Sequence, residues 1–214
     1  FYVWMPKTLQ SFVEGQIYAQ YPSVQIHEAS EDYVANERTH KVIHTAEITV
    51  TDSQYLPIKT FQNFEVDPLA GITGTLAKLE DTDEEIWVQV LTRPVADSWH
   101  KESYNWIEKV KDGGGFSLLD GGGFKWLATI FEALWKVPEP GEGGSVKELS
   151  ERDKSRIAEA EKKAAKLGYQ IKIRLAYLGD SQSNARLRMQ AIVGTFKQFN
   201  STNLNGFTVT NSSF

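Results

Sequence analysis

The spacing of apolar residues in the first 95 residues predicts four strands and two helices. Short alternating or apolar runs are typical of strands, whereas apolar positions every three or four residues are typical of amphipathic helices. In chain order we expect a strand at 1–4, a helix at 9–21, strands at 24–27 and 40–50, a helix at 69–79 and a strand at 86–91. This βαββαβ order is that of the ferredoxin-like fold, so we expect residues 1–95 to form a ferredoxin-like α+β domain.

The remaining sequence predicts a second, αβαβ half. A helix at 99–111 precedes two glycine triplets, an apolar helix at 124–137 and a linker rich in proline and glycine. Residues 145–214 then read as a second α/β unit: a charged helix at 147–166 ended by Gly168, an alternating strand at 169–178, a helix and a last strand. The second of these helices carries an apolar stripe formed by Ala185, Met189, Ile192, Val193 and Phe196. We therefore expect the divisions 1–95, 96–144 and 145–214.

The apolar segment 124–137 has two interpretations. Its 14 residues are too few to span a bilayer as a helix. Tryptophan and lysine lie within it, and this mixture is typical of a helix at the membrane–water interface. The alternative is a helix that packs in the core or against another subunit. The residues expected to contact a membrane or a partner are Phe124, Trp126, Leu127, Ile130, Phe131, Leu134 and Trp135.

Composition narrows the chemistry further. The 214 residues are 41% hydrophobic, with 23 basic and 28 acidic side chains and a net charge of −5, an ordinary balance for a globular protein. The absence of cysteine excludes a disulfide scaffold, a thiolate metal site and a cysteine nucleophile. The glycines do not match a P-loop, and the acidic run 81–85 reads as a solvated turn. We find no catalytic constellation and expect a chain that is not an enzyme and holds no metal or cofactor.

Basic residues are concentrated toward the C-terminal end. Residues 145–198 contain 12 basic and 6 acidic side chains, whereas the rest of the chain is strongly acidic. Such asymmetry can mark a nucleic-acid interface. The alternative is a solvated helix with ion pairs between successive turns, such as Glu159 with Lys163. The candidate nucleic-acid contacts are Lys162, Lys163, Lys166, Arg186 and Arg188.

Several segments resemble one protein family. The run Phe1-Tyr-Val-Trp-Met-Pro6, the run Gln16-Ile-Tyr-Ala-Gln-Tyr-Pro22, Asp67-Pro-Leu-Ala-Gly-Ile, and Glu85-Ile-Trp-Val-Gln-Val-Leu-Thr-Arg-Pro94 are similar to the N-terminal, non-motor region of type IV secretion and conjugative DNA-transfer ATPases of uncultured small-genome bacteria. The later runs Gln170-Ile-Lys-Ile-Arg174 and Phe196-Lys-Gln-Phe-Asn200 fit the same region. The similarity covers most of the chain outside 112–144.

The resemblance implies a function in assembly rather than in catalysis. In that family the region precedes a hexamer-forming P-loop motor, and this chain contains no counterpart of the motor's phosphate-binding residues. The resemblance thus implies a non-catalytic, membrane-proximal docking domain at the cytoplasmic face of the inner membrane. The implied partners are other copies of the same protein, up to a hexamer, and the membrane surface. A stand-alone nucleic-acid-binding or structural interaction module is the alternative.

Overall fold

The computed structural model describes residues 1–35, 39–79, 84–114 and 149–213. The chain divides into two compact units, Phe1–Thr39 and His40–Phe214. In the first unit, the 3-10 helix η1 (Lys7–Leu9) leads into helix α1 (Gln10–Gln20), which confirms the predicted helix. The strands predicted at 1–4 and 24–27 do not form. A strand gains stability from a paired neighbour and a buried face, and the four side chains of Phe1 to Trp4 are all at least 60% exposed.

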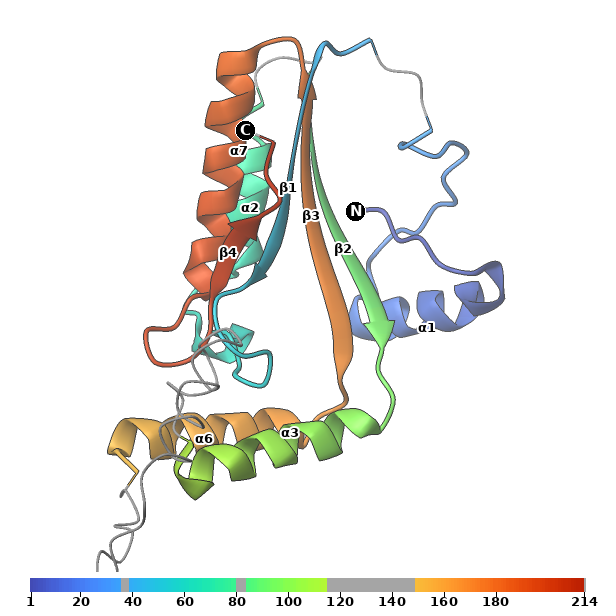
Figure 1. Cartoon of the computed structure of the whole chain (residues 1–214). Helices are drawn as coiled ribbons and strands as arrows, with labels where there is room; N and C mark the ends of the chain where they lie inside the picture. The colour runs from blue at the N-terminus through green and yellow to red at the C-terminus, as the bar shows by residue number, and fades with distance from the viewer. Residues whose placement is uncertain (36–38, 80–83, 115–148, 214) are drawn as a thin grey trace, which may run out of the picture. The chain divides into compact units, whose positions relative to one another are not determined.

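A four-stranded antiparallel sheet forms the centre of the second unit (Figure 1). Its strands are β1 (Val42–Val50), β2 (Glu85–Pro94), β3 (Tyr169–Gly179) and β4 (Phe207–Thr210), in the spatial order β2-β3-β1-β4. The longest pairing joins β2 to β3 and runs without interruption from Glu85 opposite Leu178 to Pro94 opposite Tyr169. The α+β class predicted from the sequence is confirmed.

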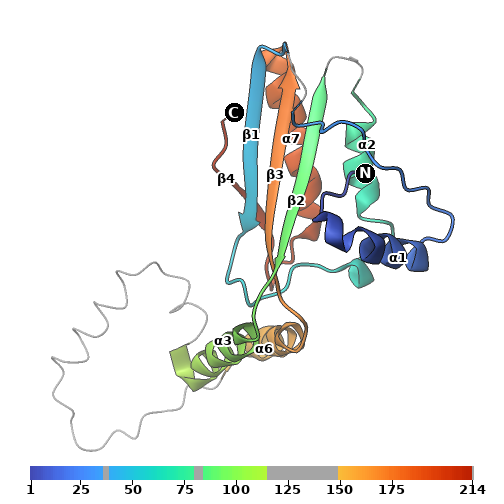
Figure 2. The ribbon, with the colours of Figure 1, turned by 90° about the vertical axis from the view of Figure 1, so that its right-hand side faces the viewer.

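Two helices cover one face of this sheet. Helices α2 (Leu69–Leu76) and α7 (Gln182–Phe196) lie side by side on the same face, as Figures 1 and 2 show from two directions. The 3-10 helices η2 (Phe61–Asn63) and η4 (Lys197–Phe199) precede α2 and follow α7. Ser181 is the N-cap of α7, and its side chain accepts a hydrogen bond from the Asn184 amide. The buried residues between sheet and helices are Ala46, Ile48, Ile72, Ile173, Leu175, Tyr177, Ala185, Met189, Ile192 and Phe196.

A helical hairpin, which we call the arm, connects β2 to β3. It consists of α3 (Ser98–Lys109), a π-helical turn η3 (Val110–Gly114) and α6 (Glu151–Ala164). The two helices lie side by side across the end of the β2–β3 ribbon (Figures 1 and 2). The arm has a hydrophobic core of its own, made of Leu56, Ile107, Val110, Ile157, Ala160 and Ala164.

The sheet takes its strands from both halves of the sequence. Of the four strands expected within 1–95, only the two at 40–50 and 86–91 form, as β1 and β2, and β3 and β4 from the predicted second half complete the sheet. The reason is burial, because the alternating apolar residues of β3 lie between β1 and β2 and share their covered face. The predicted division into 1–95, 96–144 and 145–214 stays a prediction.

Gly168 has a different role from the predicted end of a helix. Helix α6 ends at Ala164, and a Cβ atom on Gly168 would lie 2.6 Å from the Val95 side chain and 2.8 Å from Trp99. Glycine is therefore required at the point where the chain passes from the arm into β3, because the side chains of Val95 and Trp99 lie too close to the backbone of Gly168 for a Cβ atom.

Candidate functional site

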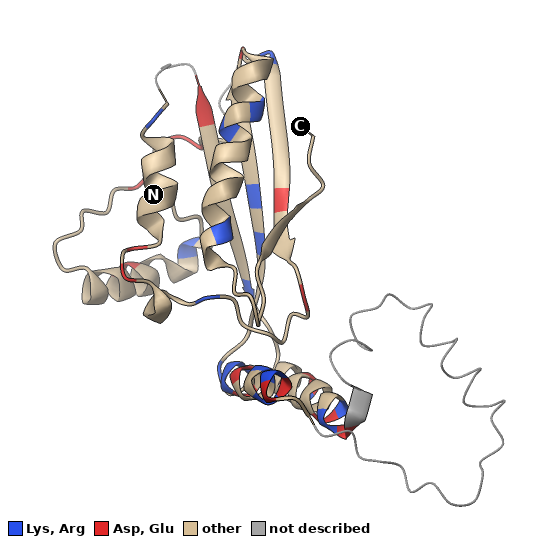
Figure 3. Cartoon of the chain, turned by 90° about the vertical axis from the view of Figure 1, so that its left-hand side faces the viewer, with Lys and Arg blue, Asp and Glu red and all other residues tan. Residues whose placement is uncertain are grey.

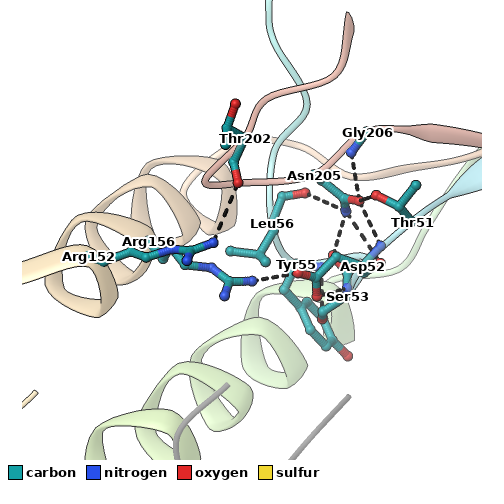
Figure 4. Close-up of polar contacts among 10 residues, drawn as sticks. All are labelled: Thr51, Asp52, Ser53, Tyr55, Leu56, Arg152, Arg156, Thr202, Asn205 and Gly206. Carbon is teal, nitrogen blue, oxygen red and sulfur yellow. Dashed lines mark hydrogen bonds and ion pairs between the residues drawn. The ribbon is translucent and has the colours of Figure 1, made fainter. Parts of the chain in front are cut away.

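The loop after β1 joins the arm to the sheet, and we call residues 51–57 the clamp loop (Figure 4). The side chain of Asn205, 1% exposed, lies against this loop. Its Oδ1 accepts hydrogen bonds from the backbone amides of Asp52 and Gly206, both at 2.9 Å. Its Nδ2 donates to the carbonyls of Ser53 at 2.8 Å and Leu56 at 3.3 Å. One side-chain amide thus supplies hydrogen-bond partners to buried backbone groups that have no partner in a helix or a sheet.

Two arginines of α6 hold the arm to the clamp loop and to the loop before β4. Arg156 pairs with the Asp52 carboxylate at 2.5 Å, and both side chains are largely buried. Arg152 donates to the carbonyl of Thr202 at 3.5 Å. Figure 4 shows both arginines reaching from the same helix toward the two loops. A buried pair of this kind fixes geometry, because removing either partner leaves an uncompensated charge.

Apolar contacts complete the clamp. Leu56 is fully buried, and it is the member of the arm's core that comes from outside the arm. Its neighbour Tyr55 lies against two tryptophans of α3, with ring centroids 5.5 Å from Trp99 and 5.4 Å from Trp106. The clamp loop therefore packs into the hairpin at the same place where its polar groups are held.

Lys163 of α6 is a third link to the clamp loop. Its ammonium donates to the carbonyl of Gln54 at 2.6 Å and to that of Leu56 at 3.1 Å. Burial lowers the pKa of Lys163 to about 8. The cation is thus held by carbonyl dipoles rather than by a carboxylate.

The lowered pKa of Lys163 predicts that this residue stabilises the fold more as the pH rises. Between pH 8 and 10.5 the unfolded side chain keeps its proton while the folded one loses it, so raising the pH favours the folded state. We expect the free energy of unfolding of the wild type, relative to Lys163→Met, to rise by about 1–2 kcal/mol over that range. Urea denaturation at several pH values measures this difference, and parallel pH profiles for the two proteins would contradict it.

A second buried polar cluster lies under the start of β2. The Glu84 carboxylate accepts hydrogen bonds from Tyr177 Oη at 2.8 Å, Asn184 Nδ2 at 3.0 Å and Arg188 Nε at 3.3 Å. Burial by itself would raise the pKa of Glu84, but the hydrogen bonds from Tyr177 and Asn184 and the Arg188 charge outweigh it and lower the pKa. The expectation of a solvated turn is therefore wrong for Glu84.

Replacing Glu84 with glutamine tests the importance of this charge. The depressed pKa means that the carboxylate stabilises the fold above its unfolded pKa, near 4.3, and that this contribution is lost as the pH falls through the folded value. We expect Glu84→Gln to lower the free energy of unfolding by about 1–3 kcal/mol at pH 7, because an amide cannot accept from all three donors. The deficit should shrink on acidification, and a deficit that is independent of pH would contradict this assignment.

The five candidate nucleic-acid contacts do not form one surface. Lys163 and Arg188 are engaged by the clamp loop and by Glu84. Lys162 is paired with Glu159 of the same helix at 2.6 Å, and its side chain is 70% exposed. Lys166 and Arg186 are exposed, but Lys166 lies just after the end of α6 and Arg186 lies in α7. Figure 3 shows basic and acidic residues intermixed on the arm. The ion pair expected between Glu159 and Lys163 is replaced by one between Glu159 and Lys162, and Lys163 binds the clamp loop instead.

The seven residues expected to contact a membrane or a partner lie outside the described residues. In the part of the chain that the structure describes, none of the helices is long and apolar enough to cross a membrane. The same part contains no group of three or more His, Asp or Glu side chains arranged to hold a metal ion. His44 of β1 is buried, and His40, which precedes this strand, lies 3.7 Å from Glu85.

The structural residues of the clamp were not predicted from the sequence. Asn205 and Asp52 lie 153 positions apart, and nothing in either local sequence indicates their contact. The loop before β4 is nevertheless rich in asparagine, a residue whose side chain often forms hydrogen bonds with the backbone of irregular segments. This composition is the one local feature that indicates such contacts.

Comparison with known proteins places the chain in a family. A family model described as "Domain of unknown function (DUF8128)" matches residues 1–212. The chain belongs to this family. No curated protein and no solved structure matches it. The DUF8128 match spans both compact units and the arm, so the clamp lies within the family's domain.

Proposed function

We propose that this DUF8128 chain is a non-catalytic docking domain of a type IV secretion-like ATPase that acts in conjugative DNA transfer. In this proposal it lies at the cytoplasmic face of the inner membrane, and its partners are other copies of the same protein and the membrane surface. The sequence resemblance is the basis for proposing an ATPase and a location at the membrane. The arrangement of the arm is the basis for proposing that the domain docks.

One observation carries the proposal: the β2–β3 connection is a helical arm that is fastened at its base. Five residues of the clamp loop and of α6 make this attachment, namely Asp52, Tyr55, Leu56, Arg156 and Lys163. The first part of the arm ends at Gly114, and the second part begins with α6 at Glu151. The segment between these residues contains the apolar run 124–137. A fixed arm whose two helices are joined by a sequence with an apolar run suits a domain that docks.

The buried polar groups of the second unit support a structural role. The Glu84 carboxylate, the Asn205 amide and the Asp52–Arg156 pair are each used in contacts within the fold. A catalytic group must instead be able to reach a substrate. Among the described residues, these groups therefore stabilise the unit and offer no reaction centre.

We further propose that the second unit is ferredoxin-like, with the arm inserted between its second and third strands. The order of elements is β1, α2, β2, arm, β3, α7, β4, and the strand order is β2-β3-β1-β4. This order corresponds to a split βαβ arrangement built from residues 42–210 rather than from 1–95. Such a sheet has both helices on one face.

Binding of single-stranded nucleic acid is the second candidate function. The face opposite α7 carries Lys172 and Arg174, but both lie near Glu47, at 2.6 Å and 3.7 Å. Together with the divided cations of α6 and α7, this pairing weakens the case. A micromolar, salt-sensitive shift with single-stranded DNA would favour this candidate over docking, and no binding at low salt would exclude it.

Nucleotide turnover tests the non-catalytic part of the proposal. The purified 214-residue chain should hydrolyse ATP no faster than a buffer blank, with and without Mg²⁺. Turnover that co-purifies with the chain through two successive columns, and that disappears when the clamp is disrupted by Asn205→Ala, would overturn it.

A further inference from the structure

Strand β2 is an edge strand of the sheet. It lies at one end of the order β2-β3-β1-β4, and in the described residues no strand pairs with its outer side. It pairs with β3 over ten consecutive positions without a bulge. Val90 and Leu91 of this strand are 57% and 42% exposed.

Several common protections of an edge strand are missing from β2. Proteins shield such edges with lysine, with proline inside the strand, with bulges or with very short strands. The sequence Glu-Ile-Trp-Val-Gln-Val-Leu-Thr-Arg-Pro contains no lysine, and its one proline is the last residue. An edge strand of this length without lysine, internal proline or a bulge is suited to pairing with another strand.

The sequence of β2 is complementary to itself in one antiparallel register. If Gln89 lies opposite Gln89 of a second copy, Glu85 faces Arg93 and Trp87 faces Leu91 on one side of the sheet. On the other side Val88 faces Val90, and Ile86 faces Thr92. Directly opposed side chains on neighbouring strands are close enough to interact, so opposite charges and apolar pairs stabilise such a pairing.

We propose that two copies of the chain associate through β2, antiparallel and centred on Gln89, to form a continuous eight-stranded sheet. A two-fold axis perpendicular to the sheet makes each contact occur twice, as in other isologous dimers. This axis leaves each face of the sheet on its own side, and side chains alternate between the two faces along a strand. Starting from Gln89 opposite Gln89, the pairing can therefore shift only by an even number of positions. Of these, the register centred on Gln89 is the one that opposes Glu85 and Arg93.

The existing contacts of these charges are compatible with pairing. Glu85 accepts a hydrogen bond from Trp87 Nε1 at 2.8 Å and lies 3.7 Å from His40. Arg93 bonds the side-chain oxygen of Gln170 on β3. A guanidinium has five donors, and Arg93 uses two of its nitrogens on Gln170, so this side chain keeps donors for the partner's carboxylate.

This inference names a partner for the proposed docking domain and so rests on that function. In each copy the arm extends toward the side of the sheet that carries α7 (Figure 1). A perpendicular two-fold axis preserves that side, so the two arms of the dimer would project from the same face. Both arms could then engage one surface.

Cysteine cross-linking tests the register directly, because the natural chain contains no cysteine. In the proposed dimer, Gln89→Cys places two thiols opposite each other, within the range of a disulfide. Thr92→Cys is the matched control, because its two thiols would be roughly 20 Å apart along the strands. Under mild oxidation we expect Gln89→Cys to form a covalent dimer and Thr92→Cys to stay monomeric on a non-reducing gel. Equal cross-linking of both variants, or of neither, would overturn the proposed register.

Charge reversal tests the same contact without cysteine. We expect Glu85→Arg and Arg93→Glu each to weaken self-association about tenfold in analytical ultracentrifugation, because each creates two like-charge pairs. The double variant should restore association to near the wild-type value. A wild-type chain that is monomeric throughout, or a dimer that ignores the single reversals, would overturn the pairing. Neither result affects ATP turnover or liposome binding, which test the docking function separately.

Discussion

Replacing Asn205 with alanine should lower the free energy of unfolding by about 3–5 kcal/mol, a large effect for one polar residue. The side chain is 1% exposed and satisfies amides and carbonyls of the clamp loop. Alanine would leave these groups buried without partners, and each such group costs about 1–3 kcal/mol. Urea denaturation followed by circular dichroism measures the loss.

Asn203, two positions earlier, provides a matched control. It is exposed, so Asn203→Ala should change the free energy of unfolding by no more than about 0.5 kcal/mol. Asn205→Asp should be nearly as damaging as Asn205→Ala, because a carboxylate oxygen would replace the donor that faces the Ser53 and Leu56 carbonyls. A loss below about 1 kcal/mol for Asn205→Ala would show that the clamp loop does not depend on this amide.

Replacing Leu56 with alanine should release the arm from the sheet. The side chain is fully buried among residues of α3, η3 and α6, and such truncations cost about 2–5 kcal/mol. Because Leu56 belongs to the arm's core and not to the sheet's core, we expect the loss to be local. Amides of α3 and α6 should exchange faster with deuterium, while those of β3 and α7 keep their protection.

Leu187 is the control for this experiment. It is 63% exposed on α7, so Leu187→Ala should leave the exchange of the arm and of the sheet unchanged. Uniform acceleration of exchange across the second unit in Leu56→Ala would mean that arm and sheet unfold together. Unchanged exchange in the arm would contradict the role of Leu56 as its anchor.

Local sequence patterns predicted most elements of the second unit but not how they assemble. The alternation of apolar residues from Tyr169 to Leu178 identifies β3, and the apolar stripe from Ala185 to Phe196 identifies α7. Both patterns are clear because each element buries only one of its faces. The run Phe1 to Trp4 has the composition of a strand and yet stays exposed. Composition shows which residues can form a strand, whereas pairing depends on which strands share a covered face.

The clamp could not be predicted because its partners are far apart in sequence. Arg156 meets Asp52 across 104 positions, and Lys163 meets Leu56 across 107. Glu84 stands in an acidic run whose local appearance is that of a solvated turn, and only the packing of β3 and α7 brings Tyr177 and Arg188 to it. Charged residues that serve the fold look the same in sequence as charged residues that serve a ligand.

Liposome flotation tests the central claim most directly. The wild-type chain is mixed with vesicles that contain anionic lipid and is compared with the variant Trp126→Ala/Trp135→Ala. Docking through the apolar run 124–137 predicts that the wild type floats with the vesicles while the double variant stays at the bottom, with identical circular dichroism spectra. A wild-type chain that does not float, or a double variant that floats equally well, would contradict the proposed docking domain.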